Sequence, residues 1–418
     1  MPPTARPGTS GSSNYWLLPL SLAGLGALGW ACQDDAGPGS TGDDTLDGEV
    51  SRADVLDSIA HEVLVPTTAQ FADTAASLRD AVDAYAEATE SDPAGVDGPQ
   101  AAAQQAWRDT LAGWQQLEVM QIGPAAPSLT AIGGENLRDA IYSWPTVDSC
   151  SIDRALVDED YARDDFLVTE LPWAHGLDAL EYLLFVHDAD HTCPTQVQLD
   201  GPWDALTPEQ LELRRARYAQ VVAEGIAAQA SALATRWSPE GDDFASALAE
   251  PGQGQSPYAS EAEALDQVFR AMFYLDKQTK DGKLGLPMGL VDGCPDVPCS
   301  ELMEAPFSGD SAAAIGANLR AMRMLMQGGA DPETAVGFDD LLEGVGHPEI
   351  ASELLVNIDA AIAVADAIDQ PLQQALVDDP AQVEALHAAI REVTTVLKGP
   401  MVMALRLTIP AEGAGDND

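Results

Sequence analysis

The sequence contains few basic residues. Of its 418 residues, 20 are Lys or Arg and only four of these are Lys, against 68 Asp and Glu, which gives a formal net charge of −48. A field of that sign repels nucleic acid and anionic lipid surfaces, so nucleic acid is excluded as a partner. The sequence also lacks G-x-S-x-G, a phosphate-binding loop and a dinucleotide fingerprint, and His61-Glu62 has no second His to complete a zinc-protease motif.

Long apolar runs are missing too, except near the N-terminus. An uncharged stretch from Tyr15 to Ala31 follows Arg6 and is shorter than the roughly 20 residues that span a bilayer. Such a segment, ending in small residues, is typical of a secretory signal, so residues 1–31 are predicted to be a signal peptide. The next residue, Cys32, resembles the acylated Cys of a bacterial lipobox. We expect a periplasmic or outer-membrane lipoprotein held to the membrane by this lipid, with a plain secretory signal as the alternative.

Cysteine is scarce as well. Besides Cys32, the chain has Cys150, Cys193, Cys294 and Cys299. An even number of thiols outside the cytoplasm favours disulfides, and the short Pro-rich loop around Cys294 and Cys299 favours their pairing, which leaves Cys150 for Cys193. A zinc site is the weaker alternative, because no two Cys have the C-x2-C spacing.

Runs of alternating β-branched residues are absent, and apolar residues recur at helical spacing instead. Residues 32–50 are acidic and Gly-rich, so they are predicted to be a disordered tether. After them, stripes of apolar residues indicate amphipathic helices, and the chain is predicted to be all-α with helix packed on helix. The polar segment 187–206 suggests a domain boundary, with helical-bundle domains at 51–205 and 206–412. The stripes used are Leu78/Val82/Tyr85, Ala103/Trp107/Leu111/Trp114, Leu319/Met322/Met326 before Gly328, and Val383/Leu386/Ile390/Val393/Leu397 after Asp379-Pro380.

The segment Leu171–Val186, LPWAHGLDALEYLLFV, carries acids inside an apolar helix pattern. His175, Asp178 and Glu181 recur at steps of three, which predicts that they share one side of a buried helix beginning at Pro172. A buried carboxylate requires a compensating partner. Either a metal ion or an internal ion pair with Arg108, Arg138 or Arg320 would supply one.

Gly176-Leu177-Asp178-Ala179-Leu180-Glu181 resembles the G-x-H-x-x-E motif of the imelysin family, with Asp178 at the position of the motif His. Other segments add to the resemblance, which runs from about residue 52 to 400: AWRDTLAGWQQLEVMQIGP (106–124), YSWPTVDSCSID (142–153), EAPFSGDSAAAIGANLRAM (304–322) and GFDDLL (337–342). The resemblance implies an exported, all-helical protein of two bundles with the motif near a cleft between them. The family includes peptidases of the imelysin type and proteins linked to iron uptake.

Two further residues are candidates for the same site. Glu118 follows the Trp107/Trp114 stripe and is expected to face the bundle interior, with an exposed Glu as the alternative. Arg138 is the expected charge partner of Asp178 or Glu181. The loop His187-Asp188-Ala189-Asp190-His191 also offers donors that suit a metal, although donors in an acidic loop are more often simply solvated.

Three functions are therefore open. The favoured one is an exported lipoprotein that binds a metal ion through Asp178, Glu181, His175 and Glu118. Hard oxygen ligands suit Fe³⁺, Mn²⁺ or Ca²⁺ better than zinc, and the resemblance points to iron and a link to iron uptake. The second is an imelysin-type metallopeptidase with Glu181 as the candidate catalytic residue. The third is a non-catalytic, partner-binding surface lipoprotein whose buried acids are structural.

Overall fold

The computed structural model describes residues 50–145 and 147–410. Cys32, the predicted signal peptide and nearly all of the predicted tether lie outside these residues. All regular secondary structure in the described part of the chain is helical, which confirms the all-α prediction. Within the same residues, none of the helices has both the length and the apolar composition of a membrane span.

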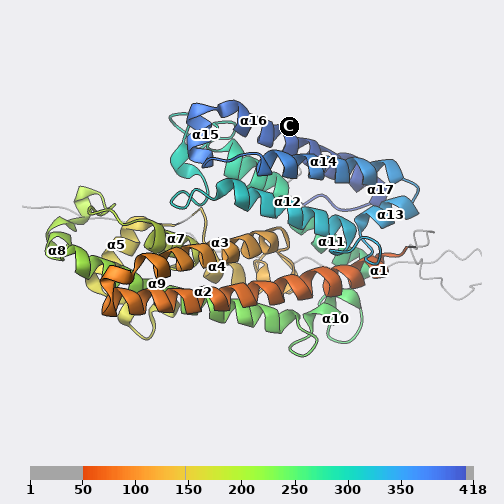
Figure 1. Cartoon of the computed structure of the whole chain (residues 1–418). Coiled ribbons are helices and arrows are strands. Elements are labelled where there is room, and N and C mark those ends of the chain that lie inside the picture. The colour runs from red at the N-terminus through yellow and green to blue at the C-terminus, as the bar shows by residue number, and fades with distance from the viewer. Residues whose placement is uncertain (1–49, 146, 411–418) are drawn as a thin grey trace, which may run out of the picture. The chain divides into compact units, whose positions relative to one another are not determined.

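The first half of the described chain forms a group of helices around two long ones, α2 and α9 (Figure 1). The long α9 lies along α2, α3 packs on the other side of α2, and α7 lies against both α3 and α9. The elements are α1 (Arg52–Ser58), the π-helical η1 (Ile59–Leu64), α2 (Val65–Ser91), α3 (Asp97–Val119), α4 (Leu137–Ile141), α5 (Ser149–Asp158), α6 (Phe166–Thr169), α7 (Leu177–Phe185), α8 (Asp200–Asp204), α9 (Pro208–Trp237) and α10 (Phe244–Ala249).

The second half is arranged around α14, which packs against α12, α13 and α16. Helix α16 also contacts a long π-helical segment, η7. The elements are α11 (Glu261–Met272), η7 (Leu275–Gly285), α12 (Ser311–Gln327), α13 (Phe338–Gly344), α14 (Pro348–Asp366), α15 (Leu372–Asp378), α16 (Pro380–Val396), the π-helical η9 (Leu397–Met401) and α17 (Val402–Leu405). The packing of α12 on α3 joins the two groups (Figure 1).

The apolar stripes of the sequence coincide with buried helix faces. Leu78, Val82 and Tyr85 are buried in α2, and the Trp107/Trp114 stripe is buried in α3. The predicted ends are also confirmed, because α12 stops at Gly328 with φ 70° and α16 begins at Pro380. Burial of these stripes supplies the hydrophobic driving force for helices that would be marginal alone.

The expected boundary at residue 205 falls just before α9. Because α9 packs along α2, its principal contacts are with helices that precede the boundary. The described residues, 50–145 and 147–410, group as one compact unit. The division into domains and the cleft between them stay predictions.

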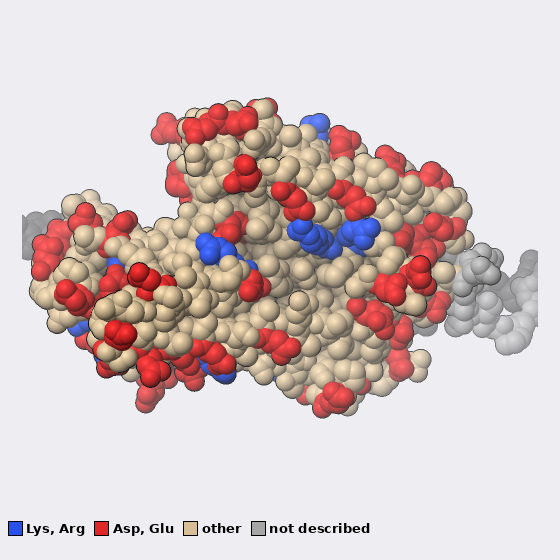
Figure 2. All heavy atoms as spheres, in the orientation of Figure 1, with Lys and Arg blue, Asp and Glu red and all other residues tan. Residues whose placement is uncertain are grey.

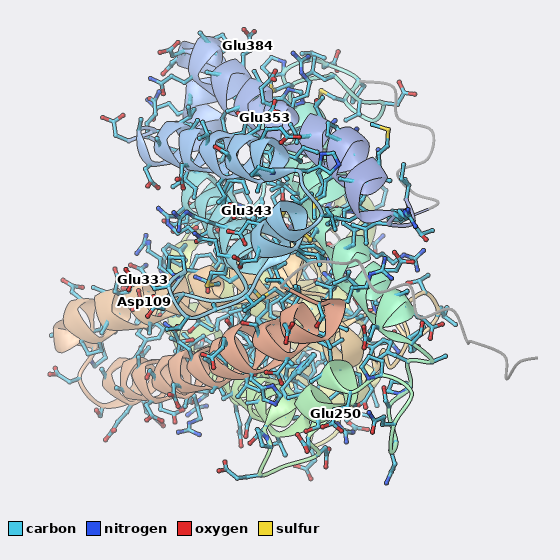
Figure 3. The ribbon with its side chains drawn as sticks, turned by 90° about the vertical axis from the view of Figure 1, so that its right-hand side faces the viewer. Asp109, Glu250, Glu333, Glu343, Glu353 and Glu384 are labelled. Carbon is cyan, nitrogen blue, oxygen red and sulfur yellow. A yellow bond between two sulfur atoms is a disulfide. The ribbon has the colours of Figure 1, made fainter. Side chains whose placement is uncertain are left out.

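Acidic side chains are scattered over the visible surface and outnumber the basic ones there (Figure 2). Six that Figure 3 labels come from different helices and loops and point outward, and all six are exposed: Asp109, Glu250, Glu333, Glu343, Glu353 and Glu384. Dispersed charge of this kind keeps a surface hydrated and resists association. The acids that matter for the candidate site are therefore the few that are buried.

Candidate functional site

The motif helix begins later than the sequence pattern predicts. Pro172–Ala174 forms only a short 3-10 turn, and α7 starts at Leu177. Between them Gly176 has φ 91°, a left-handed conformation that favours glycine. A Cβ at Gly176 would lie 3.0 Å from the carbonyl oxygen of Ile141, so the close approach of backbone also requires glycine.

The break at Gly176 separates His175 from the acids of α7. His175 is in extended conformation, so the prediction that it shares one helical side with Asp178 and Glu181 is wrong. The physical reason is the positive φ of Gly176, which turns the chain before the helix begins. His175 is buried, and this burial lowers the pKa of its imidazole.

Asp178 accepts two hydrogen bonds from Ser143. The hydroxyl of Ser143 donates to Oδ2 of Asp178 at 2.6 Å, and the backbone N–H of Ser143 donates to Oδ1 at 3.3 Å. The carboxyl group is 3 % exposed, and this burial raises its pKa to about 6 despite both hydrogen bonds. Asp178 thus ties the first turn of α7 to the segment after α4.

Glu181 reaches the segment that precedes α12. The backbone N–H groups of Phe307 and Ser308 donate to its Oε1 at 3.0 and 2.7 Å. Burial, with a smaller contribution from the nearby charge of Asp178, raises the pKa of Glu181 to about 8 despite these hydrogen bonds. A carboxyl group with that pKa is mostly protonated at neutral pH, so its burial requires no cation.

The three arginines considered as partners are engaged elsewhere. Arg108 pairs with Asp310 at 2.9 Å and Arg320 with Asp366 at 2.6 Å. Arg138 donates to the carbonyl oxygen of Trp144 at 2.9 Å and lies 3.8 Å from Glu118. Among the ion pairs of residues 50–145 and 147–410, none includes Asp178 or Glu181. Arg138 was expected to pair with Asp178 or Glu181, but its nearest carboxylate partner in this region is Glu118. The positive charge of Arg138 still lowers the pKa of Asp178 slightly, which opposes the rise caused by burial.

Glu118 is buried, as expected, and it belongs to a second cluster of acids. Lys283 on η7 lies 3.5 Å from Glu118 and 2.9 Å from Glu304, and both glutamates are completely buried. The hydroxyl of Tyr274 donates to Glu118, and that of Tyr142 donates to Glu304 at 2.8 Å. Burial raises the pKa of Glu304, while the charge of Lys283 opposes that rise.

Amide side chains complete this cluster and connect α3 with α12. Gln115 donates to Glu304 at 2.9 Å, and Asn318 donates to the backbone and side-chain oxygens of Gln115 at 2.6 and 3.0 Å. Lys283 also donates to Asn318 at 2.8 Å. Tyr142 donates to Glu304 of this cluster, and the next residue, Ser143, donates to Asp178. The cluster therefore lies next to the hydrogen bonds of Asp178. We call Gln115, Glu118, Lys283, Glu304 and Asn318 the lysine cluster.

Sequence reasoning missed Lys283, Glu304 and Ser143. Two signals were present: Lys is rare in this chain yet occurs three times in residues 277–283, and Glu304 opens one of the segments that resemble the family. Neither signal identifies the partner, since Lys283 and Glu118 lie 165 residues apart in sequence.

The remaining sequence candidates are structural. Disulfides join Cys150 to Cys193 and Cys294 to Cys299, which confirms both predicted pairs. His187 pairs with Glu212 at 2.9 Å and His191 with Asp200 at 2.9 Å, so the two histidines of that loop have different partners. In the described part of the chain, no group of three or more His, Cys, Asp or Glu side chains is arranged to hold a metal ion.

The donor set is therefore a poor fit for a complete metal centre. Asp178 and Glu181 offer two carboxylates, each already bound to neutral N–H or O–H donors, and His175 and Glu118 are directed elsewhere. Hard cations usually take six or more oxygen ligands, including waters. Asp178 and Glu181 are better suited to joining α7 to neighbouring segments through hydrogen bonds, and Glu181 also to holding a proton.

Comparisons with known proteins agree with this all-helical fold. A structure named an iron-regulated protein A precursor, from Parabacteroides distasonis, matches with a TM-score of 0.65 at 20% identity, covering 85% of this chain and 95% of that chain. An imelysin-like protein from Psychrobacter arcticum 273-4 matches with a TM-score of 0.64 at 17% identity, covering 87% of this chain and 99% of that one. No curated protein matches the chain.

The family model named Imelysin matches residues 64–398, which is most of the chain and includes both α7 and the lysine cluster. The resemblance that the motif segment indicated is thus confirmed over residues 64–398. This protein belongs to the imelysin family.

Proposed function

We propose that this protein is an exported, non-catalytic binding protein linked to iron uptake, held to a membrane by a lipid on Cys32, in which the motif helix is a structural clamp. The observation that carries the proposal is the environment of Glu181. Its carboxyl group is 2 % exposed and accepts hydrogen bonds from two backbone amides of the segment before α12. A group so enclosed serves to join α7 to that segment.

The iron link has support at the level of the family. The chain belongs to the imelysin family, and a protein of similar fold carries the name iron-regulated protein A precursor. Peptide hydrolysis has less support, because Asp178 replaces the motif His and hydrogen-bonds to Ser143, while Glu181 is closed to a peptide substrate.

Metal binding by the motif acids is the second candidate, and one observation favours it. Asp178 and Glu181 are buried beside each other with raised pKa values and without an ion pair among the described residues. A cation would replace protons there and compensate both charges, although it would have to displace the present hydrogen bonds.

Thermal unfolding separates these functions. Wild type, Glu181→Gln and Glu181→Ala are melted with chelator and with added ferric iron or calcium, and exposed Glu353→Gln is the matched control. At pH 5, where Glu181 is protonated, a clamp predicts that Glu181→Ala lowers the melting temperature equally with chelator and with metal, while Glu181→Gln, which keeps an acceptor oxygen, stays close to wild type. Stabilisation of wild type by metal, lost in both variants, would instead establish the second candidate, because a ligand stabilises only the state that binds it.

Two further assays complete the test. Hydrolysis of unfolded polypeptides by wild type, abolished in Glu181→Gln, would contradict the non-catalytic assignment. For the membrane anchor, Cys32→Ser is expected to release the protein from membranes, and unchanged membrane association of that variant would refute lipidation at Cys32.

A further inference from the structure

Within the lysine cluster, the amine of Lys283 lies against the side-chain amide of Gln115. Lys283 Nζ is 2.5 Å from Gln115 Oε1. Because a C=O bond is about 1.2 Å long, the amide carbon of Gln115 lies within about 3.7 Å of this nitrogen. Reacting groups that a protein holds about 3–3.5 Å apart in a fixed orientation react far faster than the same groups in solution. The pair is thus close to the separation at which an amine attacks an amide carbon.

Glu304 contacts both partners of this pair. Its Oε2 lies 2.9 Å from Lys283 Nζ, and its Oε1 accepts a hydrogen bond from Gln115 Nε2 at 2.9 Å. One carboxyl group therefore contacts the attacking nitrogen with one oxygen and the leaving nitrogen with the other. Burial raises the pKa of Glu304, which favours transfer of a proton from the ammonium group to its carboxylate.

The amide carbonyl of Gln115 also has a donor for the negative charge that an attack creates. Asn318 Nδ2 donates to Gln115 Oε1 at 3.0 Å, and this oxygen becomes negative when an amine adds to the carbon. Thr279 and Lys283 donate to Oδ1 of Asn318 at 3.1 and 2.8 Å, which fixes the orientation of that amide. A nucleophile, a proton carrier and an oxyanion donor are therefore brought together at one amide.

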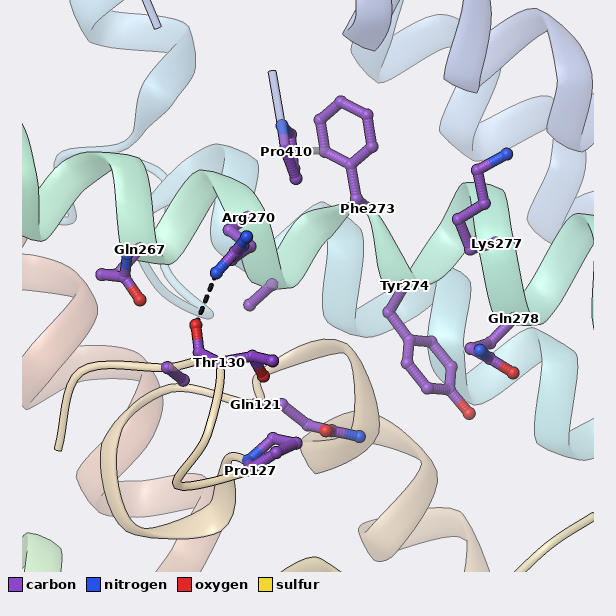
Figure 4. Close-up of a pocket in the computed structure, with 12 residues that line it drawn as sticks. Gln121, Pro127, Thr130, Gln267, Arg270, Phe273, Tyr274, Lys277, Gln278 and Pro410 are labelled. Atoms are coloured by element: carbon purple, nitrogen blue, oxygen red, sulfur yellow. Dashed lines mark hydrogen bonds between the residues drawn. The ribbon is translucent and has the colours of Figure 1, made fainter. Parts of the chain in front are cut away.

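The surroundings of Lys283 keep water away from these groups. Every member of the lysine cluster is buried, and Lys283 is 1 % exposed. The rings of Trp144 and Tyr274 flank its Nζ at 5.8 and 5.4 Å. Tyr274 also lines a surface pocket beside the loop after α3, so it forms the boundary between that pocket and the cluster (Figure 4). A desolvated ammonium group loses its proton more readily, and exclusion of water protects a newly formed amide from hydrolysis.

We propose that Lys283 and Gln115 join in an intramolecular isopeptide bond, with Glu304 as the catalytic acid and base. The structure holds the two side chains before this reaction. Lys283 Nζ gives a proton to Glu304 and attacks the amide carbon of Gln115. A second proton passes from Nζ through Glu304 to Nε2, the bond between the carbon and Nε2 breaks, and ammonia leaves. The product is a secondary amide, and Glu304 keeps one proton and is neutral.

The charges of the cluster are compatible with this product. The ammonium charge disappears together with the charge of Glu304, while Glu118 keeps Arg138, whose Nε lies 3.8 Å from its Oε1. The bond would join α3 to η7 between residues that are 168 positions apart in sequence. Closing so long a loop restricts the unfolded chain, so the bond is expected to stabilise the fold, and unlike the two disulfides it resists reductants.

Peptide mapping of the purified full chain by mass spectrometry, after reduction of its disulfides, tests the proposal. The bond links the peptides that hold Lys283 and Gln115 and lowers their summed mass by about 17 Da, the mass of ammonia. Lys283→Met, Gln115→Met and Glu304→Gln each remove one part of the site at nearly constant volume. Glu118→Gln is the matched control, because Glu118 is an equally buried acid whose hydrogen bonds come from Tyr274 and Lys283.

Wild type and Glu118→Gln are expected to contain the linked peptide and to migrate faster in a reducing, denaturing gel than the other variants. Glu304→Gln keeps both reacting groups, so it is expected to fold, as circular dichroism would show, yet to remain unlinked. Recovery of the Lys283 and Gln115 peptides only singly and at full mass in wild type would overturn the proposal, whatever the stability of the variants. A linkage to Asn318 instead would overturn the assignment of Gln115, and a linkage that persists in Glu304→Gln would overturn the role of Glu304.

Discussion

Two groups of buried acids lie next to each other in this protein, and they are stabilised in opposite ways. Asp178 and Glu181 on α7 receive hydrogen bonds from neutral hydroxyl and amide donors. Glu118 and Glu304 instead share Lys283. At neutral pH Glu181 therefore tolerates burial by holding a proton and Asp178 by its hydrogen bonds, whereas Glu118 and Glu304 do so by ion pairing.

This difference determines which of the buried acids can gain or lose a proton near neutral pH. A pKa raised to about 8 leaves Glu181 mostly neutral at pH 7, so its two hydrogen bonds act as a clamp without a net charge to compensate. In the lysine cluster the cation matters most to Glu304, because removal of Lys283 would leave Glu118 with Arg138 at 3.8 Å but Glu304 without an ion pair among the described residues. The comparison predicts different responses to mutation and to pH.

The largest effect is expected from Lys283→Met. Removing one partner of a buried ion pair costs about 3–5 kcal/mol, since the remaining charges stay buried without compensation. Urea unfolding measures the loss. Adding Glu304→Gln to this variant removes one of the stranded charges and is expected to restore part of the stability. A loss below about 1 kcal/mol in Lys283→Met would contradict the ion-pair description of the cluster.

A smaller loss is expected from Glu181→Ala. The amides of Phe307 and Ser308 would lose their acceptor, and a buried donor without a partner costs about 1–3 kcal/mol. Glu181→Gln keeps a carbonyl oxygen and should cost less than about 1 kcal/mol at pH 6. Equal losses in the two variants, measured by urea unfolding, would show that these hydrogen bonds are not what Glu181 contributes.

Gly176→Ala tests the entry to the motif helix. At φ 91° a side chain is strained by about 1–3 kcal/mol, and the new Cβ would meet the carbonyl oxygen of Ile141. The melting temperature should fall accordingly. Gly98→Ala is the matched control, because no atom lies close to the added Cβ there and the position is helical. A Gly176→Ala variant as stable as Gly98→Ala would refute the backbone requirement.

Asp178→Asn should have the smallest effect. The asparagine side chain keeps an acceptor for the Ser143 N–H, and the serine hydroxyl can accept from its amide. Less than about 1 kcal/mol of stability should be lost at pH 5, where Asp178, with a pKa of about 6, is mostly neutral. A loss comparable to that of Lys283→Met would indicate that Asp178 is held as an anion.

Local features of this fold could be predicted from the sequence, and long-range partners could not. The apolar stripes located the faces of α2, α3, α12 and α16, and the count and spacing of Cys gave both disulfides. Burial of Asp178 and Glu181 followed from the apolar residues around them. Apart from Cys150–Cys193, which followed once Cys294 was paired with Cys299, each of these depends on residues close together in the chain.

The partners of the motif acids depend on tertiary contacts. Glu181 binds Phe307 and Ser308, more than 120 residues away, through backbone groups that every residue carries. No side-chain pattern could identify them. The start of α7, by contrast, has a local cause. The apolar pattern predicts a helix from Pro172, but Gly176 adopts a positive φ and α7 begins only at Leu177.

The pH dependence of Glu181→Gln relative to wild type, measured with chelator present, tests the central claim most directly. The folded pKa of Glu181 is raised to about 8 from an ordinary value of 4.5, so wild type gains stability from this proton at low pH and loses it as pH rises towards 8. The variant has no such proton. Its stability relative to wild type should rise between pH 5 and 8 by up to about 1.4 kcal/mol per pH unit and then level off. A difference that stays constant over this range would show that Glu181 is ionised in the folded protein and would contradict the neutral clamp.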